Sequence, residues 1–196
     1  MSDTPTPTYY LPAFTYYLQP AVVFLSFAAM IHFRKAGIKD IPLIRKLAFA
    51  VWPQTYSGIL SGEQSAYMLE MMYSESSLQH QINVQHHRFI IAAEHNDPVA
   101  FASWSATPQK NIYRLHKIYV LQNQQGKGTG RQLIDHIIAA IRPSGTAILE
   151  LNVNRHNKAK DFYIRQGFSA VREEDIAIGN GYFMNDYVMQ RSIGGQ

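Results

Sequence analysis

Apolar positions along this chain recur with two different spacings, and the spacing indicates which segments are helices. Between Ile41 and Val51 they follow one another at three- and four-residue intervals, which predicts an amphipathic helix. Asp40 stands where an N-cap residue belongs. Pro53 is expected to end the helix, because proline lacks the N–H that the next hydrogen bond needs.

Three further helical segments are expected. One begins at Ser61 and Gln64, which have the spacing of a capping box, and helical structure continues over residues 74–82. The most strongly amphipathic segment runs from Gly130 to Ile141, with its apolar residues on one face. A shorter helix is expected over residues 157–165.

The remaining apolar runs are short, are bounded by turn residues and predict strands. They cover residues 30–34, 88–93, 99–106, 112–121, 147–153, 168–172 and 182–189. Neighbouring strands joined by short turns pair antiparallel. The order of elements therefore predicts an α+β fold, with a mixed, mainly antiparallel central sheet of about seven strands flanked by helices.

The first 29 residues differ from the rest, since Asp3 is their only charged side chain. A signal peptide carries basic residues ahead of its apolar stretch, and here the first Lys or Arg is Arg34. The apolar stretch approaches the roughly 20 residues that span a bilayer, but prolines and a glutamine interrupt it, so a membrane span is not expected. Residues 1–29 are interpreted as an arm packed on the domain or on a second subunit, or as an extension upstream of a domain at residues 30–196.

Composition narrows the classes of function. With 46% hydrophobic and 16% charged residues, the chain is typical of a soluble globular protein with a substantial core. The absence of cysteine excludes disulfides and thiolate chemistry and fits a cytoplasmic location. The net charge of +4 suggests an anionic ligand, but the basic residues are scattered, so a nucleic-acid partner is not expected. His86 and His87 are adjacent before a strand and would face opposite sides, so no metal site is expected.

A glycine-rich loop between a predicted strand and the long helix carries the main chemical signal. Its glycines permit a close approach of the backbone to a ligand, and the first turn of the helix offers free N–H groups to a phosphate. The spacing of Gly126, Gly128 and Gly130 is too short for a Walker loop. It also differs from the dinucleotide fingerprint by one residue. On these grounds alone, the loop is either a phosphate site or a structural turn.

Two motifs give the loop a more specific interpretation. Gln125, Gly128 and Gly130 form a Q-x-x-G-x-G pattern, which resembles the acetyl-CoA pyrophosphate signature of the GCN5-related N-acetyltransferase (GNAT) family. About thirty residues downstream, residues 157–168 form N-x-A-x-x-F-Y-x-x-x-G-F, which resembles a helix-and-strand segment of that family. The resemblance covers roughly residues 30–191, firmly from Leu115 to Phe168 and loosely before. It implies the acyl-CoA N-acyltransferase fold, with acetyl-CoA as co-substrate and no metal.

The resemblance also implies a set of acetyl-CoA contacts. The main chain of Ile118, Tyr119 and Val120 would bind the pantetheine arm, and the N–H of Val120 would polarise the thioester carbonyl. Asn157 would form a hydrogen bond with the pantetheine. The residues that would hold the pyrophosphate are Gln125, Gly126, Lys127, Gly128, Thr129, Gly130 and Arg131.

The proton-transfer groups are less clearly indicated. Tyr163 matches the position where the family commonly places a tyrosine that protonates the leaving thiolate. The alternative is that Tyr163 is a packed aromatic residue with a satisfied hydroxyl. For the base that deprotonates the amine, the candidates are Glu150 and His116, with Glu63, Glu70 or a water molecule as further possibilities.

The expected activity is transfer of an acetyl group from acetyl-CoA to the primary amine of a small molecule or a peptide, by direct attack in a ternary complex. Acidic residues on the acceptor side would suit a cationic amine, with polyamines as an analogy. The alternative function is a CoA-binding regulatory module that keeps the fold without turnover. A homodimer is expected by analogy with the family.

Overall fold

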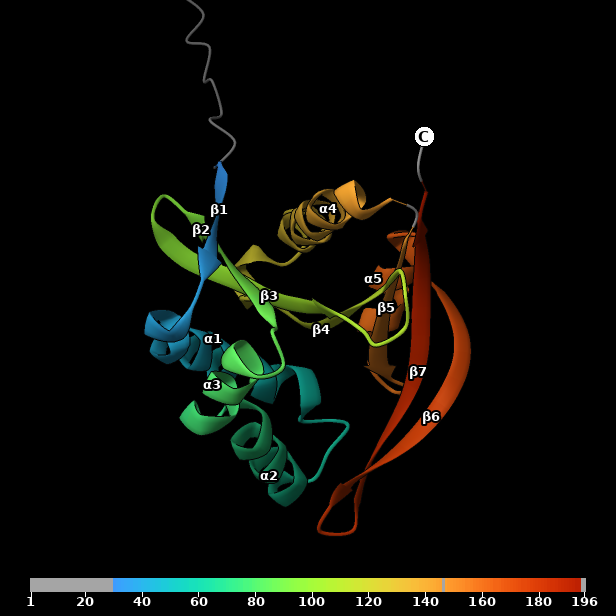
Figure 1. The fold of residues 1–196 in the computed structure, drawn as a ribbon. Coiled ribbons are helices and arrows are strands. Elements are labelled where there is room, and N and C mark those ends of the chain that lie inside the picture. The colour runs from blue at the N-terminus through green and yellow to red at the C-terminus, as the bar shows by residue number, and fades with distance from the viewer. Residues whose placement is uncertain (1–29, 146, 195–196) are drawn as a thin grey trace, which may run out of the picture.

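The computed structural model describes residues 30–145 and 147–194, in which a single mixed sheet carries helices on both faces (Figure 1). The strands are β1 (Ile31–Ala36), β2 (Arg88–Glu94), β3 (Asp97–Ala106), β4 (Ile112–Val120), β5 (Ala147–Asn154), β6 (Ser169–Gly179) and β7 (Tyr182–Ile193). The helices are α1 (Ile41–Tyr56), α2 (Gly62–Tyr73), α3 (Glu75–Asn83), α4 (Thr129–Ile141) and α5 (Ala159–Arg165).

The seven strands lie in the order β1-β2-β3-β4-β5-β7-β6. All neighbouring strands pair antiparallel except β4 and β5, which are parallel and are connected through α4. The predicted fold class, a mainly antiparallel mixed sheet of about seven strands flanked by helices, is confirmed. The expectation for an arm at residues 1–29 lies outside the described residues. Within the described ranges, no helix is long and apolar enough to cross a membrane.

The sheet separates two hydrophobic clusters, because successive side chains of a strand point to opposite faces. In β2, Ile90 packs with the cluster that contains α4, whereas Phe89 and Ile91 pack with the cluster that contains α1, α2 and α3. The apolar stripe predicted on α4 is buried, and its members are Leu133, Ile134, Ile137, Ile138 and Ile141. Helices α1–α3 therefore cover one face of the sheet, and α4 covers the other.

Asp40 is the N-cap residue of α1, as predicted, but its side chain makes no capping hydrogen bond, and the predicted end of the helix at Pro53 was wrong. The carboxylate of Asp40 instead accepts hydrogen bonds from the N–H of Gly37 (3.0 Å) and from the guanidinium of Arg34 (2.7 Å), closing a short 3-10 turn. Helix α1 also continues past Pro53 to Tyr56. The carbonyl that Pro53 leaves without a donor, four residues earlier, lies on an exposed part of the helix, where water can satisfy it.

Strand β6 is longer than predicted. The sequence predicts a strand over residues 168–172, but β6 extends to Gly179 through the run Glu173, Glu174 and Asp175. Such a charged run argues against a strand in the middle of a sheet. It is compatible with β6 because β6 is an edge strand, on which most side chains remain exposed to water.

Candidate active site

Strands β4 and β5 separate halfway along their length. Their parallel pairing runs from Ile112 opposite Ile148 to Leu115 opposite Leu151 and ends there. At the same point the pairing of β4 with β3 shifts, and His116 is left as an extra residue without a partner. A β-bulge of this kind bends its strand. The bulge at His116 therefore accounts for the divergence of β4 from β5.

Main-chain groups of β4 face the opening that this divergence leaves. The N–H of Leu121 donates to the carbonyl of Val99 on β3 (2.9 Å), and alternate residues of a strand turn their main-chain groups to opposite sides. The N–H and C=O groups of Ile118 and Val120 therefore point toward the β5 side, beyond the last pair of the ladder. The side-chain amide of Gln125 donates to the carbonyl of Val120 over 3.3 Å. The N–H of Val120 and the main-chain groups of Ile118 lie beyond the last pair of the ladder, so this strand edge can pair with an extended ligand.

The loop after β4 leads directly into the N-terminus of α4. Gly126 and Gly128 have φ angles of +80° and +85°, in the left-handed region, which costs other residues roughly 1–2 kcal/mol. Gly128 is the N-cap, and the main-chain N–H of Gln132 donates to its carbonyl. The N–H groups of the turn before Gln132 are therefore not used inside the helix. This is the geometry of an anion site at a helix N-terminus.

Gly130 has a different role from the two glycines before it. A Cβ atom placed on Gly130 would lie 3.1 Å from the ring of Phe162 on α5, closer than most such contacts. Both residues belong to the motifs identified in the sequence. The two motifs are therefore in direct contact, and the small side chain of Gly130 lets α5 approach α4.

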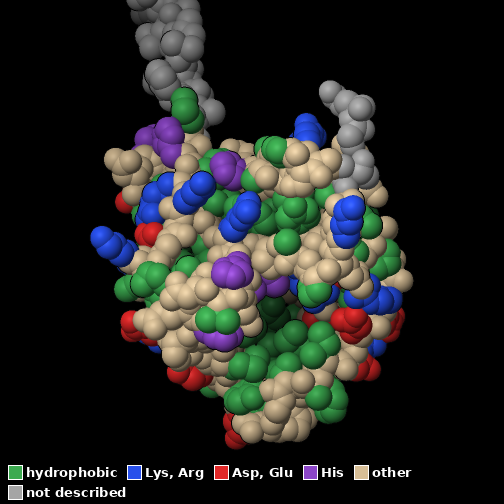
Figure 2. Space-filling view, viewed as in Figure 1, with side chains coloured by type: hydrophobic (Ala, Val, Ile, Leu, Met, Phe, Trp, Pro, Cys, Tyr) green, Lys and Arg blue, Asp and Glu red, His purple; other side chains and the backbone are tan. Residues whose placement is uncertain are grey.

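The opening between β4 and β5 is part of a cavity of about 980 Å³. The surface is hollowed here, between helices α1–α3 and strands β6 and β7 (Figure 2). Its lining includes the last turn of α1, the glycine loop and α5. Arg131, Lys158 and Arg165 are among the lining residues, and none of the described lining residues is Asp or Glu. The loop end of the cavity therefore suits a polyanionic ligand.

Most of the predicted site residues line this one cavity. They are His116, Ile118, Tyr119, Val120, Gln125, Gly126, Gly128, Thr129, Gly130, Arg131, Asn157 and Tyr163. Two predicted residues, Lys127 and Glu150, are not part of the lining. Lys127 belongs to the loop, but its side chain is exposed.

Asn157 is tied to the backbone at the start of α5. Its Oδ1 atom accepts a hydrogen bond from the main-chain N–H of Ala159 (2.8 Å). The side-chain amide group at the other end of the same side chain has two donor hydrogens. Because Asn157 lines the cavity, these hydrogens can reach a ligand there.

Tyr163 is buried in the wall of the cavity, on α5. Its ring contacts that of Phe168 edge-on, with centroids 5.8 Å apart, and packs in the cluster on the α4 face. Burial, and to a smaller extent the neighbouring Tyr56, raises the pKa of Tyr163 above its usual value. The phenol therefore keeps its proton throughout the physiological pH range and is available as a donor.

Aromatic side chains form the wall opposite α5. Tyr119 stacks on Phe101 with centroids 5.2 Å apart and meets Tyr73 edge-on at 5.9 Å. Trp52 packs on Tyr56 at 4.3 Å. Burial, and to a smaller extent the charge of a nearby carboxylate, raises the pKa of Tyr56 to about 12. Tyr56 and Tyr119 line the cavity directly, while Trp52 and Tyr73 form a buried layer behind them.

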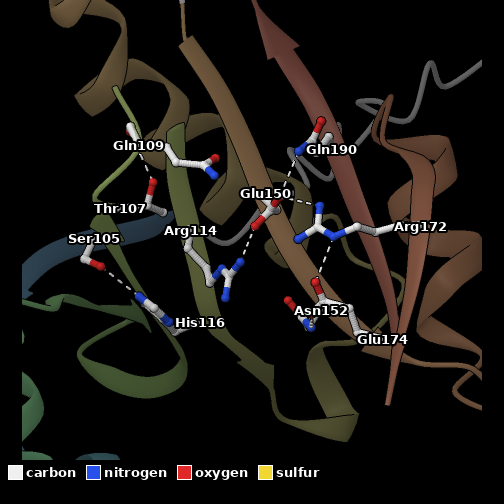
Figure 3. Close-up of polar contacts among 10 residues, drawn as sticks. All are labelled: Ser105, Thr107, Gln109, Arg114, His116, Glu150, Asn152, Arg172, Glu174 and Gln190. Carbon is white, nitrogen blue, oxygen red and sulfur yellow. Dashed lines mark hydrogen bonds and ion pairs between the residues drawn. The ribbon is translucent and has the colours of Figure 1, made fainter. Parts of the chain in front are cut away.

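His116 lines the cavity from the bulge of β4. Its Nε2 atom lies 2.8 Å from the hydroxyl of Ser105 (Figure 3). Its ring stacks on that of His87 with centroids 3.7 Å apart. Burial, with smaller contributions from His87, Lys117 and Arg114, lowers the pKa of His116 to about 3. The imidazole is therefore neutral at pH 7. Within the described ranges, no cluster of three His, Asp or Glu side chains could hold a metal ion.

Glu150 lies outside the cavity, within a network of ionic and hydrogen bonds. Its carboxylate pairs with Arg114 and Arg172 and accepts a hydrogen bond from Gln190 (2.8 Å) (Figure 3). Burial alone would raise the pKa of Glu150, but these donors outweigh it and hold the pKa below its usual value. This geometry favours a structural role over that of a base. Glu63 and Glu70, the other acidic candidates, are exposed on α2 and are also absent from the lining.

Two ionisable groups near the cavity were not identified from the sequence. Lys117 lines the cavity although it is buried, and burial lowers its pKa to about 8. Asp186 on β7 is 4% exposed, and burial raises its pKa to about 6, with the charge of Glu174 adding to the shift. Asp186 is also the carboxylate whose charge affects Tyr56. Pattern analysis predicts strands for both residues, but it does not show that their side chains turn inward.

Comparison with known proteins agrees with this architecture. The sequence profile described as "Acetyltransferase (GNAT) domain" matches residues 57–190. The PaiA N-acetyltransferase of Thermoplasma acidophilum, solved in complex with coenzyme A, superposes with a TM-score of 0.69 at 23% identity, over 83% of this chain and 98% of that one. The ribosomal-protein-S18-alanine N-acetyltransferase of Escherichia coli superposes with a TM-score of 0.63 at 18% identity, over 85% and 96%. At these identities, the similarity shows the fold.

A curated relative is similar over a shorter stretch. The 5-NmdU N-acetyltransferase of Pseudomonas phage PaMx11 is 43% identical over 60 residues, which are 30% of this chain and 41% of the phage protein. The chain therefore matches less than half the length of that relative. The match of the profile to more than half of the chain is the broader finding, and it shows that this protein belongs to the GNAT acetyltransferase family.

Proposed function

We propose that this protein is an N-acetyltransferase that transfers the acetyl group of acetyl-CoA to a primary amine. The observation that carries the proposal is the free edge of β4 at Ile118 and Val120, which faces a cavity that continues to the N-terminus of α4. An extended pantetheine arm can pair with this edge in place of β5, while the pyrophosphate lies on the helix N-terminus. The neighbour solved with coenzyme A supports the choice of ligand.

The proposed reaction is a direct attack of the amine on the thioester. The N–H of Val120, which points into the opening, would donate to the carbonyl oxygen as negative charge develops on it. As the tetrahedral intermediate collapses, the C–S bond breaks, and the Tyr163 hydroxyl would donate its proton or a hydrogen bond to the leaving thiolate. No cysteine is present to form an acyl-enzyme, so a ternary complex is the simpler route.

The amine must lose a proton before or during the attack. His116 is neutral and lines the cavity, so it can accept a hydrogen bond from the ammonium group or from a water molecule. Its pKa of about 3 makes it a weak base by itself. We therefore propose that the proton leaves through water ordered at His116 and that Glu150 takes no part in the chemistry.

The test combines a melting curve with a thiol-release assay. Acetyl-CoA at a hundred times its dissociation constant should stabilise the protein by about 2.7 kcal/mol, which is a rise in Tm of roughly 5–10 °C. Thiol release with one class of amine would support the proposed function. A rise in Tm without release for any amine would favour the alternative, a CoA-binding module. An unchanged Tm would contradict acetyl-CoA binding at the loop.

The amine panel should include the acceptor named by the phage relative. The 43% identical segment supports testing 5-NmdU beside simple alkyl amines, polyamines and peptides. A cytoplasmic location and a homodimer stay predictions, and the second is testable by the mass of the protein in solution.

A further inference from the structure

The N-terminal half of the chain is joined to its C-terminal hairpin by a set of contacts that we call the clasp. It consists of Gln64 and Tyr67 on α2 and of Ile178, Tyr182 and Phe183 on the β6–β7 hairpin. The hydroxyl of Tyr67 donates to the carbonyl of Ile178 (2.6 Å), and the amide of Gln64 donates to the carbonyl of Phe183 (3.1 Å). The rings of Tyr67 and Tyr182 lie 5.7 Å apart.

Gly179 makes the close approach of the hairpin possible. Its φ angle is +93°, and a Cβ atom placed on it would lie 2.6 Å from the Tyr67 hydroxyl oxygen. Any other residue would therefore meet both backbone strain and a clash with the clasp. The turn at residues 179–181 thus has a role that its sequence alone does not reveal: the hairpin can bend back onto α2.

The hairpin and α2, which the clasp joins, meet at one end of the hollow that leads to the cavity (Figures 1 and 2), although no clasp residue lines the cavity itself. Ile178 and Met184 on the hairpin, and Leu60 in the connection between α1 and α2, each pack against the cluster under helices α1–α3. The same connection contributes Gly58 and Ile59 to the cavity lining. The hairpin and α2 meet below the hollow (Figures 1 and 2). A through-going groove, which a polypeptide chain would need to lie across the site, is therefore blocked on this side.

We call the part of the cavity beside the connection between α1 and α2 the acceptor end. Its charge also restricts what can bind there. The residues that line it beside the connection include Gln54, Thr55 and Lys117, and no carboxylate is found among the described lining residues. The ammonium of Lys117 donates to the amide oxygen of Gln81 (2.7 Å) and lies 5.4 Å from the centre of the Tyr73 ring. It has no ion-pair partner within the described ranges, so its charge repels a second cation.

One carboxylate, that of Asp186, lies near the cavity and bears on the charge of the acceptor. Asp186 lies on β7 opposite Asn154 of β5, next to Val153, which lines the cavity. Its charge affects Tyr56, which also lines the cavity. A single carboxylate can balance a single ammonium group. The extended, multiply charged chain of a polyamine would need several carboxylates, and the acidic residues of α2 that the sequence suggested for this purpose are exposed to solvent.

We propose that the acceptor is a small primary monoamine, held in the closed end of the hollow by the clasp, rather than a polyamine or a lysine side chain of a protein. This inference rests on the proposed N-acetyltransferase function. The clasp residues act on specificity by shaping the acceptor pocket and do not take part in the transfer.

The experiment compares three acceptors with the full chain: a panel of small alkyl and aromatic monoamines, spermidine, and a lysine-containing peptide. Thiol release gives kcat/KM for each. The wild type should favour a monoamine over both other acceptors by at least tenfold. The double variant Gln64→Ala, Tyr67→Phe removes both hydrogen bonds of the clasp. It should raise KM for the monoamine several-fold, leave the KM for acetyl-CoA unchanged, and bring peptide kcat/KM closer to that of the monoamine.

Matched controls separate the clasp from general loss of stability. Gln79→Ala removes an amide on α3 that donates to Glu75 of the same helix, and Tyr113→Phe removes a hydroxyl bonded to Ser144. Neither should change the preference. The inference would be overturned if the wild-type kcat/KM for spermidine or the peptide equalled or exceeded that for every monoamine. This outcome would leave the proposed N-acetyltransferase function standing. An unchanged preference in the double variant would also overturn the inference. If none of the tested acceptors gave thiol release, the proposed function would be overturned, and this inference with it.

Discussion

The cavity has one end proposed for CoA and one proposed for the acceptor, and the two are built in different ways. The end proposed for CoA is formed mainly by one continuous stretch, from β4 through the glycine loop to α4, with α5 beside it, and relies on main-chain groups such as those of Val120 and Gly128. The proposed acceptor end is lined by side chains from α1 and β4, and residues of α2 and β7 pack in the cluster behind them, so that it depends on segments far apart in the sequence. A ligand shared by a family can be bound by backbone geometry, whereas a particular acceptor requires side chains that can change independently.

The largest effect expected at the junction of the two ends is that of Tyr163→Phe. Loss of the hydroxyl should lower kcat by roughly 10²–10⁴-fold, since the thiolate would leave without a donor. The affinity for acetyl-CoA should stay within about twofold, because the ring still packs on Phe168. Steady-state kinetics and a binding titration would measure the two effects. Normal turnover in this variant would show that Tyr163 is a packed aromatic residue without a role in proton transfer.

Glu150→Ala tests whether a buried carboxylate outside the cavity is structural. Its removal leaves Arg114 and Arg172 without their shared partner, and we expect a loss of about 2–3 kcal/mol in the free energy of unfolding. The kcat of the folded fraction should change little. Urea unfolding and thiol release would measure both. The matched variant Glu173→Ala breaks an exposed ion pair with Arg155 and should cost less than about 1 kcal/mol. A fall in kcat with unchanged stability would restore Glu150 as a candidate base.

Gly128→Ala tests the backbone of the CoA end. The φ angle of +85° is unfavourable for alanine, so we expect a loss of about 1–2 kcal/mol, shared between stability and acetyl-CoA affinity. The stabilisation by acetyl-CoA in a melting curve should shrink, while KM for the amine should not change. Gly62→Ala, at the first turn of α2, adds the same methyl group in open space and should have no such effect. Full acetyl-CoA affinity in the Gly128 variant would argue against the loop as the pyrophosphate site.

Asp186→Asn tests the acceptor end through pH. The folded-state pKa of Asp186 is about 6, above the unfolded value of about 3.9, so the folded state favours the protonated form. The stability that this provides is fully present below about pH 4 and is lost as the pH rises through about 6. Asparagine stays neutral, so the variant should be about 1–2 kcal/mol more stable than the wild type at pH 7.5 and equally stable at pH 4.

Urea unfolding at the two pH values would measure this difference. Asp97→Asn, at the exposed start of β3, is the matched control and should change stability by less than about 0.5 kcal/mol at both. Destabilisation by Asp186→Asn at pH 7.5 would mean that the carboxylate makes a favourable contact there. A loss of amine turnover together with a gain in stability would identify Asp186 as a functional group kept at the expense of stability.

Much of the fold and of the CoA end followed from local sequence. The stripe of α4 and the alternation of β2 are periodic patterns, and Gly126 to Gly130 define their loop within five residues. The bulge at His116 left a signal that could have been recognised. Leu115 and Ile118 face the same cluster although they are three residues apart, where a regular strand would require two or four.

The acceptor end could not be predicted in the same way. Whether Glu150 reaches the cavity depends on Arg114 and Arg172, which come from two other strands. The inward orientation of Asp186 depends on the register between β7 and its neighbours. Local patterns assign such residues to strands, but only the packing of distant segments determines which side chains meet.

Because of the clasp, the two ends of the cavity can be completed only at different stages in the synthesis of the chain. The bond between Gln64 and Phe183 spans 119 residues, and that between Tyr67 and Ile178 spans 111. By contrast, β4, the glycine loop and α4 are complete once residue 141 has been made. A chain emerging from the ribosome therefore contains the glycine loop well before its acceptor pocket can close. Under the proposed function, the chain acquires its selectivity for the acceptor only with its last hairpin.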